Sequence, residues 1–407
     1  MAGVRDVSVG ADIVGVMKLV VQVRLDTDAS AHMALTETLD ACNRAATWVS
    51  EVAFDKNVFR RMPLQKLVYG QVKAEFGLSA QPALLVLSKV DAAYKTLHAN
   101  LKAGSYGKPG SKRRTLIEAK PVVFRSDAGQ PFDDRCLSWQ IPDEGTTGTV
   151  SIWTTHGRLK NIKFSAGMRQ MEWLRAHRKG ESDLVLRDNV FYLYATVDIP
   201  EAAEYEPDGW IGVDLGIVNI AYTSDGRSWS GGAVTFRRKK NQYLRKKLQS
   251  KQTRSAKRLL KQRRRKESRF VRDTNHKIAH RIVTEAQRTG TGIALETLTG
   301  IRSRARLRKP QRVTLHTWAF AQLGELIEYK ARLNGVPLVH VNPAYTSQRC
   351  SDCGHTEKQN RLNQAEFACR RCGTISHADH NAARNIAQLG AMTWVAGQKS
   401  PVHQTTT

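Results

Sequence analysis

Four cysteines near the C-terminal end constrain the fold more than any other feature of this sequence. They form two Cys-x-x-Cys pairs, Cys350 with Cys353 and Cys369 with Cys372, separated by fifteen residues. A two-residue spacer lets both thiolates of a pair reach one tetrahedral ion, and the second pair completes the coordination sphere at Zn–S distances of about 2.3 Å. The spacing therefore predicts a zinc ribbon that holds one structural Zn²⁺ ion.

The charge of the chain indicates a polyanionic partner. Its 407 residues include 64 Lys and Arg against 37 Asp and Glu, a formal net charge of +27, which favours nucleic acid. A membrane surface is the alternative, but no apolar run is long enough to span a bilayer, and the N-terminus lacks the regions of a signal peptide. Because Cys42 and Cys136 lie far apart, we expect no disulfide framework. We expect a prokaryotic cytoplasmic protein that associates with the nucleoid when it binds DNA.

The first half of the chain combines strand-like and helical patterns. A strand pattern at Val16–Leu25 falls in residues 1–30, and residues 31–103 carry three helical stripes of apolar side chains. Residues 104–205 contain short strands and a hairpin turn at Asp188-Asn189. Because the early strand lacks a local partner, we expect it to join the later sheet. The helical block would then be an insertion into a β-barrel of an α+β multidomain protein.

The second half alternates strands with helices, which indicates a mixed α/β domain. We expect this domain over residues 206–345, with a basic helical insertion at 237–290. The zinc ribbon would follow at 346–376, and the chain would return to the α/β domain at 377–395. The segment 396–407, which lacks a hydrophobic pattern toward its end, is expected to be a disordered tail.

A long basic segment within this domain predicts a surface for phosphate. Residues 237–272 contain a single acid, Glu267, and no proline, and leucines supply an apolar seam. One or two long helices are therefore expected, and because solvated surface helices normally mix both signs of charge, phosphate binding is favoured over a bland surface. A second basic run, Arg302–Arg312, is expected to be a mobile loop over the groove. The predicted nucleic-acid contacts are Arg237, Arg238, Lys239, Lys240, Arg245, Lys246, Lys247, Arg263, Arg264, Arg265 and Lys266.

Three acids stand where a metal-dependent hydrolase needs them. Asp214 lies inside an apolar strand, where an unpaired acid is unfavourable, Glu296 ends a second apolar strand, and Asp379 begins an alanine-rich helix. Hydrolysis of a phosphodiester by two Mg²⁺ ions requires several carboxylates that converge on one point. Each acid alone has an ordinary role, as a turn residue, a strand-end surface acid or a helix cap. Together, in a basic chain, they favour a metal site.

These motifs resemble the TnpB (OrfB) proteins of insertion sequences, the apparent ancestors of the type V CRISPR effector nucleases. The explicit match covers residues 208–390, whereas residues 1–207 resemble the family only in length and in the order of domains. The segments that carry the resemblance are Ile211–Gly216, Leu295–Leu298, Asn342–Gly354 and Asp379–Ile386.

The resemblance implies an RNA-guided DNA endonuclease with a RuvC domain of the RNase H fold. Asp214, Glu296 and Asp379 would form its catalytic triad and bind two Mg²⁺ ions. The β-rich region would be the wedge domain and the helical block the recognition lobe. The expected partners are a guide RNA of the omega type and double-stranded target DNA beside a short flanking motif. Because the triad and the ribbon are complete, we expect an active enzyme.

Several interpretations stay open from the sequence. A compact type V CRISPR effector that uses a crRNA has nearly the same chemistry, a guided repressor binds DNA without cutting it, and a transposase joins strands. The intact triad argues against the repressor. The ribbon either positions Asp379 only or also contacts nucleic acid, and closed four-cysteine sites favour the first role. His380 and Asn381, beside that acid, either assist the site or pack the helix.

Overall fold

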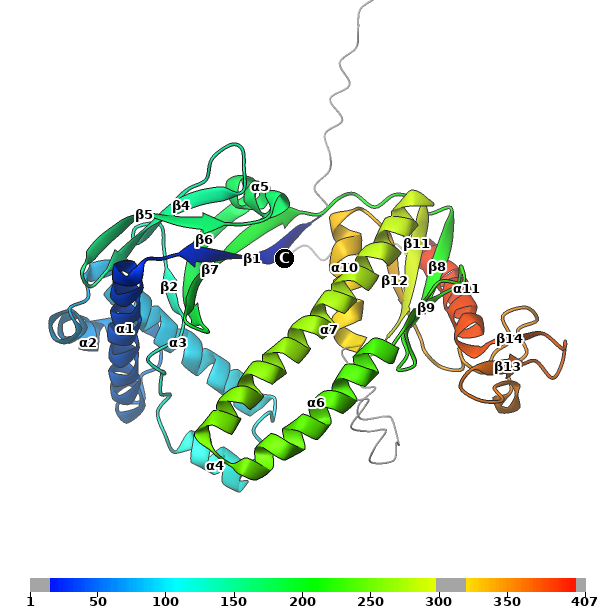
Figure 1. The fold of residues 1–407 in the computed structure, drawn as a ribbon, viewed down its shortest axis with the longest axis horizontal. Helices are drawn as coiled ribbons and strands as arrows, with labels where there is room; N and C mark the ends of the chain where they lie inside the picture. The colour runs from blue at the N-terminus through cyan, green and yellow to red at the C-terminus, as the bar shows by residue number, and fades with distance from the viewer. Residues whose placement is uncertain (1–14, 298–319, 400–407) are drawn as a thin grey trace, which may run out of the picture. The chain divides into compact units, whose positions relative to one another are not determined.

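The chain divides into two compact units (Figure 1). A computed structural model describes residues 15–297 and 320–399. One unit is Val16–Ile199, and the other comprises Met1–Gly15 together with Pro200–Thr407. Each unit has its own hydrophobic core, so the two are described separately.

The first unit is built on a seven-stranded sheet of order β2-β6-β7-β1-β5-β4-β3. β1 pairs antiparallel with β5, with Arg24 opposite Ser165, which confirms that the early strand joins the later ones. β2 and β3 are the two edges of this sheet, which is nearly closed. Its strands are β1 (Val16–Asp26), β2 (Gln130–Phe132), β3 (Leu137–Gln140), β4 (Thr147–Thr154), β5 (Gly157–Ser165), β6 (Arg178–Arg187) and β7 (Val190–Pro200).

The hairpin that joins β6 to β7 turns where the sequence predicted it. Asp188 and Asn189 have φ values of +52° and +61°, the left-handed conformation that a type I′ turn requires at both central positions. Asn and Asp tolerate this conformation better than other residues with a side chain, because their polar groups bond locally. The turn therefore sets the register in which Val190 lies opposite Arg187.

Helices between β1 and β2 form a separate apolar core in the first unit. The N-terminus of α1 is capped by Asp28, which accepts a hydrogen bond of 2.7 Å from the amide of Ala31. α2 ends at Gly77, whose φ of +62° suits a glycine C-cap. The buried Tyr94 of α3 donates to the carbonyl of Ser50 in α1. The helices of this unit are α1 (Ala29–Asp55), α2 (Arg61–Phe76), α3 (Ala80–Lys102), α4 (Lys112–Glu118) and α5 (Met168–His177).

The second unit contains a five-stranded mixed sheet, as the alternating pattern predicted. Its order is β10-β9-β8-β11-β12, and β8, β11 and β12 are parallel while β9 and β10 run antiparallel to their neighbours. The strands are β8 (Gly209–Asp214), β9 (Asn219–Thr223), β10 (Ser228–Ser230), β11 (Thr291–Glu296) and β12 (Leu338–Val341).

Helices cover both faces of this sheet. Ile293 and Leu295 of β11 belong to one core cluster with α7 (Arg254–Arg288) and α10 (Phe320–Leu333). Ala294, which points to the opposite face, packs instead with Ile386 of α11 (Ala378–Lys399). Both faces are therefore buried, which explains why the sequences of β8 and β11 are continuous apolar runs.

The remaining elements belong to the basic segment and to the ribbon. α6 (Gly232–Lys251) precedes α7, so the predicted basic insertion consists of two long helices. The ribbon carries a short 3₁₀ turn (Lys358–Asn360), β13 (Glu366–Ala368) and β14 (Ile375–His377). α11 continues past residue 396, where the tail was predicted to begin, so that boundary is wrong by several residues. Of the helices described, none is both long and apolar enough to cross a membrane.

The contact between α11 and β8 depends on a glycine. A Cβ atom on Gly212 would lie 2.0 Å from the carbonyl oxygen of Ala383 and 2.4 Å from the amide nitrogen of Ala387. These are backbone atoms of α11, so they cannot move aside as a flexible side chain does. On the same face, a Cβ on Gly390 would lie 2.5 Å from the Cβ of Ala294. The helix backbone therefore rests directly on the strands.

Substitution Gly212→Ala tests this close contact. The added methyl group must displace α11, and overpacking of this kind costs about 1–3 kcal/mol of unfolding free energy. We expect a lower Tm in thermal unfolding, together with loss of the tertiary near-ultraviolet circular dichroism of the second unit. Gly324→Ala is the matched control, because a Cβ there has no neighbour within 4 Å and alanine favours the α10 helix. An unchanged Tm for Gly212→Ala would contradict the proposed backbone contact.

Candidate active site and metal centre

Two of the three predicted acids lie at the same edge of the sheet. Asp214 is the last residue of β8, and Glu296 is the last residue of β11. These strands are adjacent and parallel, and Val213 pairs with Leu295, the residues that directly precede the two acids. Asp379 lies in the first turn of α11, the helix that packs on β8. Two neighbouring strands and one helix therefore carry the three carboxylates toward one region.

The charges of these acids influence each other. Burial, together with the charges of Glu296 and Asp379, raises the pKa of Asp214 to about 7, although Arg361 and the Leu215 amide oppose this shift. Burial also raises the pKa of Glu296, against a hydrogen bond from the hydroxyl of Thr346. Because burial and two neighbouring acids disfavour the charged form of Asp214, a bound cation would stabilise this site.

Two residues that the sequence analysis did not single out hold Asp379 in place. The side-chain Nδ2 of Asn219, at the start of β9, donates to Oδ2 of Asp379 over 2.9 Å. Arg361 reaches the other oxygen, Oδ1, at 3.7 Å from within the ribbon. Both residues are remote from Asp379 in sequence, and neither belongs to a motif, so only the folded arrangement identifies them.

The carboxylates converge less tightly than the cysteines do. Within residues 15–297 and 320–399, Cys350, Cys353, Cys369 and Cys372 form the one group of at least three such side chains whose ligand atoms all lie within 4.8 Å of each other. The acids do not meet that distance. Their donor chemistry nevertheless fits Mg²⁺, which binds through a few carboxylates and keeps water molecules and substrate oxygens as its other ligands.

The cysteine sulfurs already have the geometry of a tetrahedral site. Sγ of Cys350 lies 3.7 Å from Sγ of Cys372, and Sγ of Cys353 lies 3.6 Å from Sγ of Cys369. Four sulfurs about 2.3 Å from a central Zn²⁺ ion stand about 3.8 Å apart at the corners of a tetrahedron. The cluster therefore fits one zinc ion, and it fits the Cys₄ type that is closed to other ligands.

The two cysteine pairs sit on matching turns. In the first pair, the amide of Gly354 donates to the carbonyl of Cys350 over 3.0 Å, and in the second the amide of Gly373 donates to the carbonyl of Cys369 over 2.9 Å. The two glycines have φ values of +75° and +74°. Glycine adopts this conformation without steric cost, so each Cys-x-x-Cys-Gly segment closes a tight turn that aims both thiols at one point.

Two asparagines of α11 join the ribbon to the helix that carries Asp379. Asn381 donates to the carbonyl of Arg349 over 2.7 Å and accepts from the amide of Ser351 over 2.9 Å. Asn385, one turn further on, donates to the same carbonyl and to that of Thr346. Both asparagines are fully buried. Asn381 therefore anchors the first cysteine turn, which answers the question that the sequence left open.

His380 points away from that anchor. Its Nε2 lies 3.1 Å from the carbonyl oxygen of Ser224, and its ring lies 5.7 Å from the ring of Tyr222. His377 stacks on the same tyrosine at 5.1 Å, and its Nδ1 accepts from the amide of Asp379. These contacts pack the start of α11 against β9, so both histidines have a packing role in the structure.

The predicted nucleic-acid contacts lie on α6 and α7, which pack against each other. Most of the eleven basic side chains are exposed, while Arg238, Arg263 and Arg265 are half-buried. Glu267, the single acid of the segment, accepts from Asn241 over 3.1 Å and pairs with Arg245 at 3.4 Å. The helices therefore keep a large excess of positive charge in solvent. The second basic run, 302–312, lies outside the described residues.

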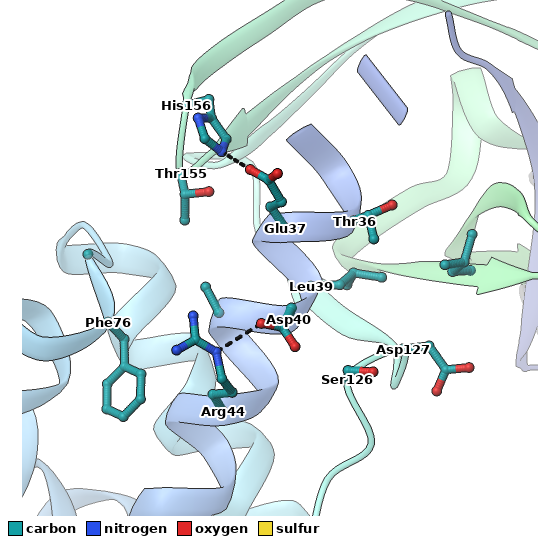
Figure 2. Close-up of a pocket in the computed structure, with 13 residues that line it drawn as sticks. Thr36, Glu37, Leu39, Asp40, Arg44, Phe76, Ser126, Asp127, Thr155 and His156 are labelled. Atoms are coloured by element: carbon teal, nitrogen blue, oxygen red, sulfur yellow. Dashed lines mark hydrogen bonds and ion pairs between the residues drawn. The ribbon is translucent and has the colours of Figure 1, made fainter. Parts of the chain in front are cut away.

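A cavity in the first unit has a different character (Figure 2). It measures about 700 Å³ and lies between α1 and the segments around Ser126 and His156. Glu37 pairs with His156 across its rim, and Asp40 pairs with Arg44 within α1, as Figure 2 shows. The three predicted carboxylates belong to the other unit, so this cavity is not the candidate active site.

Models of two protein families match the second half of the chain. The model described as "Probable transposase" matches residues 194–299, which include Asp214 and Glu296. The model of the Cas12f1-like TNB domain matches residues 320–386, which include the ribbon and Asp379. The two matches together contain every residue of the candidate metal sites.

Curated relatives carry related names. A CRISPR-associated endodeoxyribonuclease Cas12f1 of Sulfoacidibacillus thermotolerans is 43% identical over 119 residues, which is 29% of this chain and 27% of the relative. The TnpB-like protein MJ0751 of Methanocaldococcus jannaschii is 27% identical over 230 residues, which is 53% of this chain and 80% of the relative. The chain spans 27% to 40% of the length of three Cas12f relatives that it matches.

Solved structures share the fold of the whole chain. The mini-RNA-guided endonuclease CRISPR-Cas_phi3 superposes with a TM-score of 0.55 at 10% identity, over 93% of each chain. CasPhi-2 (Cas12j) bound to crRNA gives a TM-score of 0.50 at 11% identity, over 92% of this chain and 98% of the other. At this identity the likeness concerns the fold, which is an α+β fold of the Cas12 effector kind. The comparisons confirm the resemblance that the motifs predicted: the chain is similar to the TnpB (OrfB) proteins and to the compact type V CRISPR effectors.

Proposed function

We propose that the chain is an RNA-guided DNA endonuclease in which a RuvC active site hydrolyses phosphodiester bonds. The observation that carries this proposal is the convergence of Asp214, Glu296 and Asp379 at one edge of a mixed sheet, in a chain of net charge +27. The names of the relatives support it, since they include a putative RNA-guided DNA endonuclease of Escherichia coli, 44% identical over 72 residues.

In this proposal the three acids hold two Mg²⁺ ions. The bound ions would activate a water molecule and stabilise the leaving oxygen of the phosphodiester. Thr346 orients Glu296 through its hydroxyl group, and Asn219 and Arg361 orient Asp379. Fixing these carboxylates before the ions bind reduces the ordering that binding requires, which is the usual purpose of partners behind a metal ligand.

The proposed partners are a guide RNA of the omega type and target DNA beside a short flanking motif. In such a division of labour, base pairing reads the sequence and the protein supplies charge and shape. The wedge barrel would comprise residues 1–30 and 104–205, and the recognition lobe would comprise residues 31–103. The mixed domain with its ribbon would be the RuvC domain, at 206–345 and 377–395. The long exposed basic helices α6 and α7 support a nucleic-acid role for that domain.

The cysteine cluster would hold one Zn²⁺ ion that positions Asp379. The ribbon's first turn is bonded to α11 through Asn381 and Asn385, and its Arg361 reaches Asp379 itself. Zinc would therefore act on the carboxylate site by holding its neighbours, and not by taking part in hydrolysis.

The first test is guide-dependent cleavage. The chain is purified with the RNA expressed from its own locus, and the complex is incubated with Mg²⁺ and a plasmid library that carries the guide's target beside randomised flanks. We expect one discrete RNA and breaks that depend on it, and we expect Asp214→Asn to abolish the breaks while RNA binding is kept. Asp225→Asn is the matched control, since Asp225 pairs with Arg227 away from the three acids. Binding without breaks in the unaltered chain would favour the repressor.

The raised pKa of Asp214 predicts how stability depends on pH without metal. Between about pH 4 and pH 7 the folded chain keeps a proton that the unfolded chain has released. The free energy of unfolding therefore falls as pH rises through this window, by at most about 1.4 kcal/mol for each pH unit. Asp214→Asn removes the carboxyl group whose ionisation destabilises the folded chain. The Tm of this variant should therefore exceed that of the wild type at pH 8, by a margin that shrinks toward pH 5.

Asp225 provides an internal control for the sign of this pH dependence, because its pKa is shifted in the opposite direction. Burial acts to raise the pKa of Asp225, but hydrogen bonds from Arg227 and Thr223 hold it below its usual range. Asp225→Asn should therefore lower the Tm at pH 8, opposite to Asp214→Asn. Differential scanning calorimetry in EDTA at several pH values measures both. If Asp214→Asn is destabilising throughout, burial and the two neighbouring acids do not disfavour the charged form of Asp214 as inferred.

Loss of zinc should disturb folding and cleavage together. Cys369→Ser removes one of four ligands, so we expect a substoichiometric zinc content by plasma mass spectrometry, a lower Tm and little cleavage. Cys136→Ser, a buried cysteine outside the ribbon, should keep its full zinc content. Full stability and full cleavage in a zinc-free Cys369→Ser chain would contradict the proposal that zinc positions Asp379.

A further inference from the structure

Two large aromatic side chains stand in solvent on α6, a helix with many basic residues and no acid. Phe236 and Tyr243 of α6 are 70% and 67% exposed. Exposed aromatic rings are unfavourable in water, and a helix of such high charge has no need of them for solubility. Their placement suits a partner that accepts an apolar ring inside a field of positive charge.

Helix geometry places these rings on one line with lysines. Seven residues are within about 20° of two full turns, so Phe236 and Tyr243 point the same way, about 10.5 Å apart along the axis. Lys240 and Lys247 follow each ring at a spacing of four and share its face. The line Phe236, Lys240, Tyr243 and Lys247, which we call the aromatic stripe, therefore alternates ring and positive charge.

The aromatic stripe faces away from α7. Arg237 lies over the ring of Phe270 at 4.2 Å, and Asn241 donates to Glu267, so those positions mark the side that meets α7. Lys240 and Lys247 lie on the other side and are exposed. Within the part of the chain that the structure describes, neither lysine is paired with an acid. Their charge is therefore available to an external anion.

One end of the stripe begins beside the candidate active site. The amide of Gly231, the residue before α6, donates to the carbonyl of Val218 over 2.7 Å. A Cβ on Gly231 would lie 2.5 Å from the carbonyl oxygen of Ile217, so the two segments are in close backbone contact. Asp214 lies three residues before Ile217 in the same chain segment. A nucleic-acid strand that follows the stripe toward Phe236 would therefore approach the end of β8 that carries Asp214.

We propose that the aromatic stripe binds an unpaired nucleic-acid strand, with bases stacked on Phe236 and Tyr243 and phosphates held by Lys240 and Lys247. Alternation of rings and cations is how proteins hold single strands without reading sequence. A duplex hides the faces of its bases, so it can use the lysines but not the rings. This inference rests on the proposed function only in taking nucleic acid as the ligand, and it assigns one helix face the role of guiding an unpaired strand.

The test compares binding of three probes by the full chain, freed of nucleic acid, in EDTA. The probes are fluorescent oligo(dT), oligo(U) and a blunt DNA duplex of equal length. We expect Phe236→Ala and Tyr243→Ala each to weaken binding of the single strands by about tenfold and to change duplex binding less than twofold. Lys240→Gln with Lys247→Gln should make the negative slope of log K against log salt shallower by about 1.4 for the single strands.

Further variants separate stacking from other contacts. Phe236→Leu with Tyr243→Leu keeps apolar side chains but removes the rings, so it should lose binding as the alanine variants do. Leu259→Ala, an exposed apolar position of α7, is the control and should bind as the wild type. Iodouracil photocross-linking, mapped by mass spectrometry, should place an unpaired base on Tyr243 in the wild type.

Other outcomes would overturn the proposal. Retained binding in the leucine variant, or equal losses for single strand and duplex, would exclude stacking. A lower Tm of the alanine variants without nucleic acid would assign the rings to packing within the chain, and a change of mass in sedimentation would assign them to a second copy. Binding of single strands is measured in EDTA without any cleavage, so a failed nuclease proposal is distinguishable from a failed stripe.

Discussion

The second unit depends on direct backbone contact between α11 and β8. Gly212 lies two residues before Asp214, and Ala383 lies four residues after Asp379, so the contact joins two of the acids through very short stretches of chain. Any side chain at residue 212 larger than hydrogen would separate the helix from the sheet. The alanines of α11 serve the same purpose, because small side chains let the helix approach until the two carboxylates share one environment.

The ribbon holds α11 from a second side, close to the helix turn that carries Asp379. Its backbone is bonded to amide side chains of α11, and its first turn also pairs Asp352 with Arg384 at 2.7 Å. Hydrogen bonds between buried amides and backbone carbonyls hold geometry more strictly than apolar packing does, because they specify both distance and direction. The helix that carries Asp379 is thus held by the sheet on one side and by the ribbon on another.

Local sequence patterns predicted those parts of the molecule that local chemistry determines. The cysteine spacing predicted the cysteine cluster, the Asp188-Asn189 pair predicted the β6–β7 turn, and an apolar strand without a local partner predicted that β1 joins the later sheet. The partners of Asp379 could not be predicted, since Asn219 and Arg361 reach it only after the sheet and ribbon have assembled. The extension of α11 past residue 396 was missed because its last turn, residues 396–399, carries no large apolar side chain.

The helix pair formed by α6 and α7 has a mechanical consequence. The apolar core of the second unit includes α7 from about Phe270 onward and α6 only near Val234, so the far ends of both helices lie outside that core. With 35 residues, α7 is about 52 Å long, and roughly half of it extends beyond the apolar core. Its backbone amides should open far more often there than near the sheet, so a bound polyanion would act on this half as a stiffener as well as a ligand.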